Sequence, residues 1–209
     1  SVLYNDDQAF NELGEVADYF LVHNREIYAP LDDSVVVVIN NKPRFIRRSR
    51  GYVPEPIHCE GLDNSSILAM GSDLKNAFAM NKGSEILVGP HIGDLENIST
   101  HETLEWTIKR YKSLFSVQPD KIIIDSHPQF FSSRLGERIG ESFHLSVVPV
   151  QHHHAHIASV MAEHNLRGLV LGIAMDGTGY GPDGTIWGGE FLLCKGNQYQ
   201  RLAHIHAAP

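Results

Sequence analysis

The stretch from Val147 to Leu193 constrains the fold more than any other part of the chain. It opens with a short β-branched run that ends at Val150, and four histidines then begin an apolar-periodic segment that lasts until His164. After a short break, an apolar run of strand length follows. Strand, helix and strand in immediate succession predict an α/β protein, with imidazole side chains on the first turn of the helix.

The histidines and one carboxylate of this stretch predict a metal site. His152 and His156 are four residues apart, so both project from one helix face and could hold a single ion. His153 and His156, three residues apart, could do the same. The strand after the helix delivers Asp176 at its end, where it would supply a third ligand. Histidine and aspartate suit zinc, iron and other metals, so the histidine pair and the metal both stay open.

Glycines follow Asp176 at positions 177, 179, 181 and 184, before an alternating run over 185–193. This pattern predicts a hairpin with a wide glycine-rich turn. The backbone N–H groups of Gly177 and Gly179 could cradle a phosphate there, with the Thr178 hydroxyl as a further donor. Each feature alone is more often structural. Together they favour function, because clustered histidines lower helix propensity without adding buried apolar surface.

Composition excludes several classes of protein. A formal charge of −8 argues against a general nucleic-acid binder, which needs a basic face. No apolar run approaches the roughly 20 residues that span a bilayer, and the N-terminus has no signal pattern, so we expect a cytoplasmic protein without a membrane partner. Cys59 and Cys194 have no C-x-x-C spacing, which predicts two reduced cysteines.

The first third of the chain predicts a helix, a strand and a hairpin. The helix is expected from Asp6 to about Asp18 with Asp6 or Asp7 as its cap, and the strand over Tyr19–His23. Two further strands, Val35–Ile39 and Phe45–Arg48, flank an Asn40–Asn41 turn suited to positive φ. Four arginines at 44, 47, 48 and 50 are either a solvated face or an anion site. Gly51, prolines 54 and 56 and a polar run to Ser65 then predict a domain boundary.

Beyond this boundary the predicted elements have the order β-β-β-α-β-α-β-α. The expected strands are 67–70, 76–80, 85–88, 121–125 and 145–150, and the expected helices are 99–115, 131–141 and 152–164. This order is typical of one lobe of the actin-like, ribonuclease-H-like (ASKHA) fold. The strands at 169–175 and 186–193 and a run over 199–206 would begin a second lobe.

In a two-lobed fold the turns 71–75 and 176–184 would face one cleft from opposite sides. Lys75 then becomes a candidate phosphate contact, although an exposed turn lysine is the simpler alternative. The second lobe is barely begun at Pro209, and the chain starts at Ser1 without an initiator methionine. We therefore expect a fragment of a larger protein.

Four segments of the chain resemble a known family. They are VQHHHAHIAS at 150–159, MDGTGYGPDGTIWGGEFL at 175–192, GPHIGDLEN at 89–97 and RRSRGYVPEPI at 47–57. Together they are similar to the HypF family, the carbamoyltransferases of nickel-iron hydrogenase maturation. The resemblance implies that residues 1–55 are the end of a YrdC-like α/β domain, 56–65 a linker, and 66–209 the first lobe and the start of the second lobe of a TsaD-like domain.

The resemblance also implies a reaction and a set of site residues. The carbamoyl group of carbamoyl phosphate would pass in an ATP-dependent step, through carbamoyl adenylate, to the C-terminal cysteine of HypE, where it is the precursor of the hydrogenase cyanide ligands. His152, His156 and Asp176 match metal ligands of the family, with zinc or iron as the ion, and His153 and His154 become neighbours. Ser34, Arg48 and Arg50 resemble positions near the adenylate phosphate.

Two other functions fit the same fold. An O-carbamoyltransferase of natural-product biosynthesis would use a hydroxyl acceptor, and the RRSRGYVPEPI junction favours HypF over it. A nucleotide- or metal-binding scaffold would carry out no chemistry. The acylphosphatase-like domain, the paired C-x-x-C modules and the distal lobe of HypF are missing from this chain, so we expect activity from the full-length parent.

Overall fold

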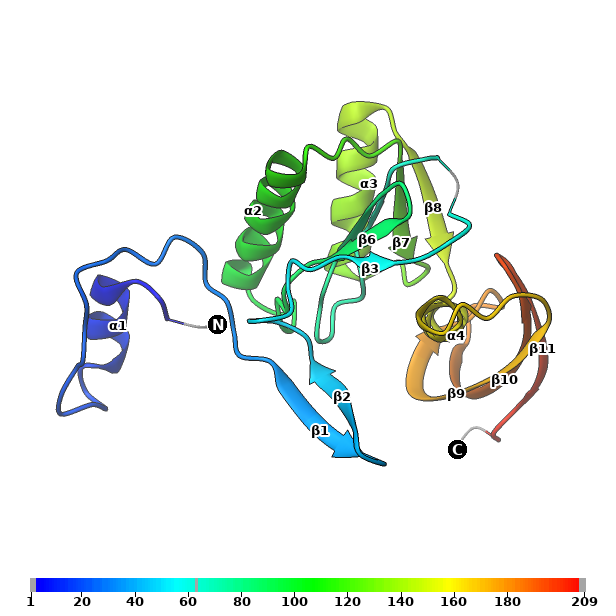
Figure 1. Ribbon diagram of the computed structural model, residues 1–209, viewed down its shortest axis with the longest axis horizontal. Helices are drawn as coiled ribbons and strands as arrows, with labels where there is room; N and C mark the ends of the chain where they lie inside the picture. The colour runs from blue at the N-terminus through cyan, green and yellow to red at the C-terminus, as the bar shows by residue number, and fades with distance from the viewer. Residues whose placement is uncertain (1–2, 63, 207–209) are drawn as a thin grey trace.

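The computed structural model describes residues 3–62 and 64–206, and the chain forms three parts (Figure 1). An N-terminal part contains one helix and a hairpin. A central part contains a six-stranded sheet with two helices on it. A C-terminal part contains a three-stranded sheet beside a third long helix. No helix among the described residues has the length and apolar character needed to cross a membrane.

The N-terminal part follows the sequence prediction only in its hairpin. Strand β1 (Val35–Ile39) pairs with β2 (Lys42–Arg47), and the two turn asparagines have φ values of 52° and 57°. Helix α1 (Asp6–Leu13) is shorter than predicted. Its cap is Asn5, whose side chain accepts the Gln8 N–H at 3.0 Å, rather than Asp6 or Asp7.

The strand predicted at Tyr19–His23 is wrong. This segment is irregular, and Tyr19 and Leu21 are almost fully exposed. A strand needs a neighbour to accept its backbone hydrogen bonds, and none of the described strands pairs with this segment. Local apolar character alone therefore gave a false prediction.

The central sheet has the strand order β3-β6-β5-β4-β7-β8. Strands β4, β7 and β8 are parallel, and β3, β6 and β5 are antiparallel to their neighbours. Its elements are β3 (Ile57–His58), β4 (Ile67–Ala69), β5 (Ala79–Lys82), β6 (Glu85–Val88), α2 (Ile98–Phe115), β7 (Lys121–Asp125), α3 (Phe131–Phe143) and β8 (Ser146–Val150), and α4 (His152–Glu163) follows. The predicted order of elements from residue 67 to the end of α4 is confirmed.

Two details differ from the prediction. Strand β5 begins at Ala79 rather than Asn76, because the buried Asn76 turns inward and its amide donates to the carbonyls of Met70 and Ser72. Strand β3 lies within the predicted linker 56–65 and extends the edge of the sheet. Residue 63 of that linker lies outside the described residues, and the domain boundaries stay a prediction.

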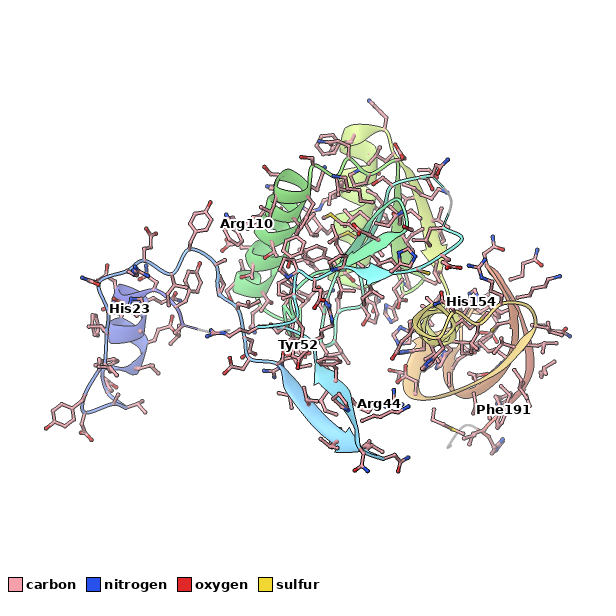
Figure 2. The ribbon with its side chains drawn as sticks, in the orientation of Figure 1. His23, Arg44, Tyr52, Arg110, His154 and Phe191 are labelled. Atoms are coloured by element: carbon pink, nitrogen blue, oxygen red, sulfur yellow. The ribbon has the colours of Figure 1, made fainter. Side chains whose placement is uncertain are left out.

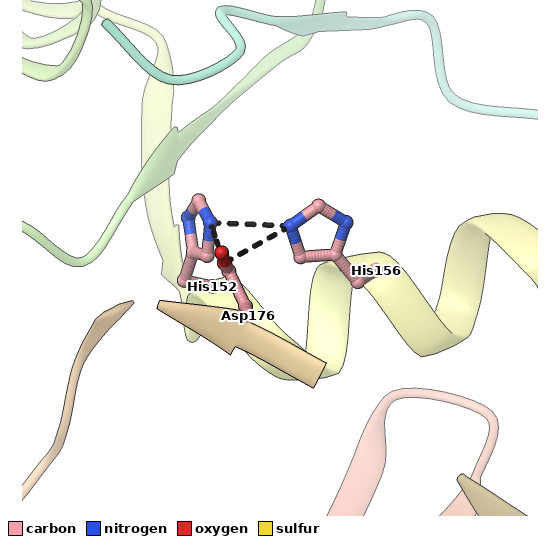
Figure 3. Close-up of side chains that lie close together, drawn as sticks. All are labelled: His152, His156 and Asp176. Atoms are coloured by element: carbon pink, nitrogen blue, oxygen red, sulfur yellow. Dashed lines mark hydrogen bonds and ion pairs between the residues drawn. The ribbon is translucent and has the colours of Figure 1, made fainter. Parts of the chain in front are cut away.

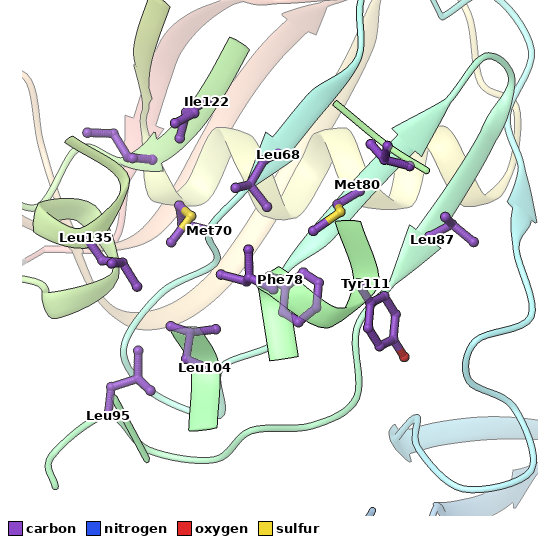
Figure 4. Close-up of a cluster of buried hydrophobic side chains, with 13 residues drawn as sticks. Leu68, Met70, Phe78, Met80, Leu87, Leu95, Leu104, Tyr111, Ile122 and Leu135 are labelled. Atoms are coloured by element: carbon purple, nitrogen blue, oxygen red, sulfur yellow. The ribbon is translucent and has the colours of Figure 1, made fainter. Parts of the chain in front are cut away.

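The main hydrophobic core lies between the central sheet and helices α2 and α3 (Figure 4). Helix α2 contributes Leu104, Ile108 and Tyr111, which recur at helical spacing and point to one face. They pack against fully buried strand residues such as Leu68 and Ile122. Each large side chain buried here stabilises the fold by roughly 1.5–3 kcal/mol, so this core fixes the strand ends that carry the site.

The C-terminal sheet is antiparallel, with the order β11-β10-β9. Its strands are β9 (Val170–Tyr180), β10 (Ile186–Lys195) and β11 (Gln198–His204), and α4 packs on it through Ile157 and Met161. The predicted wide turn over 176–184 is wrong. Strand β9 continues through Asp176 and the two following glycines to Tyr180, and only residues 181–185 turn.

Candidate metal centre

The three predicted metal ligands converge at one point between α4 and β9 (Figure 3). Asp176 Oδ2 lies 2.9 Å from His152 Nε2 and 3.4 Å from His156 Nε2. The two imidazole nitrogens are 3.2 Å apart. All three ligand atoms lie within 4.8 Å of one another, which is close enough to share one ion.

The local fold explains this convergence. Helix α4 begins at His152, where the side chain of the N-cap residue Gln151 accepts the His154 N–H. His152 and His156 follow one turn apart and therefore share a face. Strand β9 passes that face, and its alternation directs Asp176 to the same side as the buried Ala174.

Gly179 permits the close approach of β9 to α4. A Cβ at this position would lie 2.5 Å from Cε1 of His153 and 3.0 Å from Cβ of His152. Gly177, two residues earlier, has no such neighbour within 4 Å. The two glycines therefore differ in role: Gly179 is needed for packing beside the site, and Gly177 is not.

The lone pairs of the cluster fit a cation. Asp176 Oδ2 is buried and has no hydrogen-bond partner, although it lies close to two imidazole nitrogens. His152 Nδ1 is 2.6 Å from Asp125 Oδ2, and a carboxylate oxygen can only accept, so Nδ1 carries a proton and Nε2 is the nitrogen that faces the cluster. A divalent ion that displaces the protons of this cluster would be held by the two Nε2 atoms and the Asp176 carboxylate.

For both His152 and Asp176, burial shifts the pKa in one direction, and the charged and hydrogen-bonding neighbours shift it in the other. The hydrogen bond to Asp125 raises the pKa of His152 above its ordinary value, against the effect of burial. Burial would raise the pKa of Asp176, but the Gly177 N–H and the nearby histidines together lower it. The Asp176 carboxylate is therefore ionised at neutral pH and available as a ligand.

The other histidines of the motif face different partners. His153 is fully buried, its Nδ1 lies 3.0 Å from Gln151 Nε2, and burial lowers its pKa. His154 lies against the Gly196 carbonyl at 3.3 Å. Of the two histidine pairs left open by spacing, the structure gathers His152 and His156 around the carboxylate. Metal binding by this cluster remains a prediction.

The residues predicted to bind phosphate do not form the expected nest. Gly177, Thr178 and Gly179 lie in extended β9, and the Gly177 N–H donates to Asp176 Oδ1 at 2.7 Å. The wide-turn geometry is wrong because pairing with β10 continues through these residues, and the glycine at 179 serves a close approach to α4 instead of a turn. Lys75 lies at positive φ on the turn after β4, where its backbone N–H donates to Asp94. Phosphate contact by any of these residues stays a prediction.

The predicted N-terminal anion residues hold the segment around the hairpin. Ser34 Oγ donates to the Arg50 carbonyl and accepts the Ser49 N–H. Arg50 pairs with Asp33 at 3.3 Å, and Arg48 donates to the Glu55 carbonyl while its other terminal nitrogen is buried without a partner. Figure 2 marks Arg44 and Tyr52 in this region, and His154 on α4. A role at an adenylate phosphate stays a prediction.

A groove of about 370 Å³ lies next to the metal-ligand cluster. The turn after β4 contributes Gly71 and Ser72 to its lining, β7 contributes Asp125, and α4 contributes His152 and His156. Sequence reasoning missed Asp125. Its signal was available, since Asp125 ends a predicted strand and the neighbouring parallel strand ends just before His152.

Comparison with known proteins identifies the family. Residues 62–163 match the family described as HypF Kae1-like domain, and residues 172–209 match the one described as carbamoyltransferase, Kae1-like domain, second subdomain. The chain belongs to the HypF family. The resemblance seen in the sequence is thus confirmed, and the mixed α/β sheets are those of a Kae1-like domain.

Individual relatives agree with this assignment. The chain is 46% identical to carbamoyltransferase HypF of Synechocystis sp. over 94% of its length, and 41% identical to carbamoyltransferase HypF of Rhizobium leguminosarum bv. viciae over 98%. It spans about a quarter of the length of these two proteins.

Solved HypF structures have the same fold. One is a crystal structure of full-length HypF in the phosphate- and nucleotide-bound form, with a TM-score of 0.91 and 43% identity, covering 98% of this chain and 32% of that one. T. kodakarensis HypF also gives a TM-score of 0.91, with 41% identity over 98% of this chain and 27% of that one.

Proposed function

We propose that this chain is the metal-binding part of a HypF carbamoyltransferase of nickel-iron hydrogenase maturation. In an ATP-dependent reaction the parent enzyme transfers the carbamoyl group of carbamoyl phosphate, through carbamoyl adenylate, to the C-terminal cysteine thiol of HypE. One observation carries the proposal: in a chain of the HypF family, two imidazoles and a carboxylate converge beside a groove.

The metal centre would use His152, His156 and Asp176 as ligands to zinc or iron. Their ligand atoms lie within 4.8 Å of one another, and Asp176 Oδ2 is buried without a hydrogen-bond partner, which supports this set. A bound divalent ion supplies Lewis acidity toward a carbamoyl or phosphate oxygen. The protein's part is to hold the two imidazoles one helical turn apart and to keep the carboxylate ionised.

The groove supports a substrate position beside these ligands. Ser72, in the turn after β4, lines it together with His152 and His156 of α4, so a small polar group placed there would lie next to the two imidazoles. We propose Lys75, Gly177, Thr178 and Gly179 as contacts to the phosphate. A nucleotide is expected because a relative, full-length HypF, has been solved in a phosphate- and nucleotide-bound form.

The proposed domain organisation follows the family. Residues 66–209 would be the first lobe and the start of the second lobe of an actin-like, TsaD-like domain, and the observed order of elements from β4 to α4 supports this. Residues 1–55 would be the end of a YrdC-like domain. Ser34, Arg48 and Arg50 would then lie near the adenylate phosphate.

Acceptor identity can be tested directly. The complete protein would be incubated with ATP, carbamoyl phosphate and a HypE tail peptide, and the peptide mass would be measured. We expect a carbamoyl adduct on the cysteine peptide and none on a cysteine-to-alanine peptide. Transfer to a hydroxyl acceptor alone would favour an O-carbamoyltransferase, and transfer to neither would favour a non-catalytic scaffold.

A further inference from the structure

Asp125 is a buried carboxylate that lies behind the metal-ligand cluster and uses both of its oxygens. Its side chain is only 7% exposed. Oδ1 accepts the backbone N–H of His127 at 2.8 Å, and Oδ2 accepts from Nδ1 of His152 at 2.6 Å. With both oxygens engaged, the carboxylate has one orientation, and that orientation is directed at His152.

Strand pairing holds the backbone around Asp125 in place. Asp125 is the last residue of β7, where it pairs in parallel register with Val150 of β8. The next residue, Ser126, donates its N–H to the Val150 carbonyl at 3.0 Å. His152 follows Val150 by two residues, so the carboxylate and the imidazole are attached to the ends of two adjacent paired strands.

The hydrogen bond decides which nitrogen of His152 faces the cluster. Because Asp125 accepts from Nδ1, a proton stays on Nδ1, and Nε2 lies 2.9 Å from Asp176 Oδ2 and 3.2 Å from His156 Nε2, where a cation can replace any proton that it carries. A neutral imidazole without this partner divides its proton between the two nitrogens and can rotate about its side-chain torsions.

We propose that Asp125 is a positioning residue of the metal centre, which fixes the tautomer and the ring orientation of His152 so that Nε2 binds a divalent cation. The inference rests on the metal centre of the proposed function. Asp125 is not itself a ligand in this scheme, since its Oδ2 contacts the opposite side of the imidazole from the cluster. Outer carboxylates of this kind typically change metal affinity by about 10–100-fold when removed.

Asparagine at position 125 separates positioning from simple packing. It has nearly the same shape but only one oxygen. If that oxygen keeps the His127 N–H, the amide NH₂ faces His152 Nδ1, which must then accept and leaves the proton on Nε2. The wrong tautomer would oppose metal binding. In a catalytic triad the same Asp-to-Asn replacement also gives the wrong histidine tautomer, and there it lowers the reaction rate. A residue that only fills space would tolerate this substitution.

The test measures Zn²⁺ affinity of the complete protein by chelator competition, counting only the metal that the His152→Ala/His156→Ala variant lacks, because the C-x-x-C modules of the complete protein also suit zinc. We expect Asp125→Asn and Asp125→Ala each to weaken binding by about 10–100-fold. The matched control is Asp120→Asn, because Asp120 precedes the opposite end of β7 and also accepts a backbone N–H, that of Ser66 at 2.9 Å. The control should bind Zn²⁺ like the unmodified protein, and unfolding curves of all variants report their stability.

A double-mutant cycle with His152→Ala distinguishes positioning from a general structural effect. If Asp125 acts through His152, then Asp125→Asn should weaken binding no further in the His152→Ala background. Unchanged affinity of both Asp125 variants, or a fully additive loss in the cycle, would overturn the inference while leaving the metal centre intact. An unmodified protein that binds no more Zn²⁺ or Fe²⁺ than the His152→Ala/His156→Ala variant would instead refute the metal centre itself.

Discussion

Replacement of Gly179 by alanine tests whether glycine at this position is needed for the close packing of β9 against α4. The added Cβ would lie 2.5 Å from Cε1 and 2.8 Å from Nδ1 of His153. An ordinary carbon contact is about 3.5–4.0 Å, so β9 would have to move from α4 by about 1 Å. The His153 ring cannot move aside easily, because it is fully buried and hydrogen-bonded to the Gln151 side chain.

The expected cost follows from this overlap. Overpacking in a well-packed interior typically destabilises by about 1–3 kcal/mol, which raises the unfolding equilibrium constant about 5- to 140-fold. The same displacement would carry Asp176 away from His152 and His156, so metal affinity should fall together with stability. Urea unfolding and Zn²⁺ titration of the same samples measure both quantities.

Gly177→Ala is the matched control. It lies two residues earlier in the same strand, its added Cβ meets nothing within 4 Å, and alanine keeps the N–H that donates to Asp176. We expect little change in stability or metal affinity. Equal effects of the two substitutions on metal binding, or tolerance of alanine at both positions, would refute the close-approach argument.

Three further predictions concern the site and the sheet beside it. The double variant His152→Ala/His156→Ala should lose bound metal while keeping its circular dichroism, and elemental analysis with unchanged metal content would contradict the ligand assignment. The Thr185 hydroxyl, with the Thr185 N–H and the Trp187 indole, lowers the pKa of Asp183 to about 2, so its stabilisation should be complete above the unfolded pKa of about 3.9 and lost as pH falls toward 2. In the Asp183→Asn variant, the free energy of unfolding should depend less on pH between about 4 and 2. The same pH dependence as in the unmodified protein would contradict this role of Asp183. Arg201→Ala leaves the fully buried Glu190 without its bidentate partner and should cost about 3–5 kcal/mol in urea unfolding, whereas Arg138→Ala, at an exposed ion pair, should cost under about 1 kcal/mol.

Sequence patterns predicted the central part of the fold well because each pattern has a local cause. The apolar spacing of Leu104, Ile108 and Tyr111 predicted α2, and the observed helix begins within one residue of the predicted start. The Asn40–Asn41 pair predicted the hairpin turn, since asparagine tolerates positive φ. At Tyr19–His23 the apolar pattern predicted a strand, but none of the described strands pairs with this segment, and the prediction was wrong.

The glycine-rich segment after Asp176 shows why local reasoning reached a limit. Glycine is compatible with a turn and with a strand, and only pairing with β10 keeps residues 176–180 extended. The sequence therefore predicted a phosphate nest at a place where the structure has a strand packed against a helix. Position 179 requires glycine because a side chain there would collide with the His153 ring. His153 is distant in sequence, so local patterns could not predict this contact.

The sequence by itself determined which side chains could bind a metal. The four-residue spacing of His152 and His156 follows from helix geometry, and Asp176 follows a strand pattern, so all three were named without coordinates. Only the tertiary structure decided which histidines face Asp176 and placed Asp125 behind His152. That contact joins the ends of two parallel strands separated by a helix, and sheet pairing rather than local propensity sets such a distance.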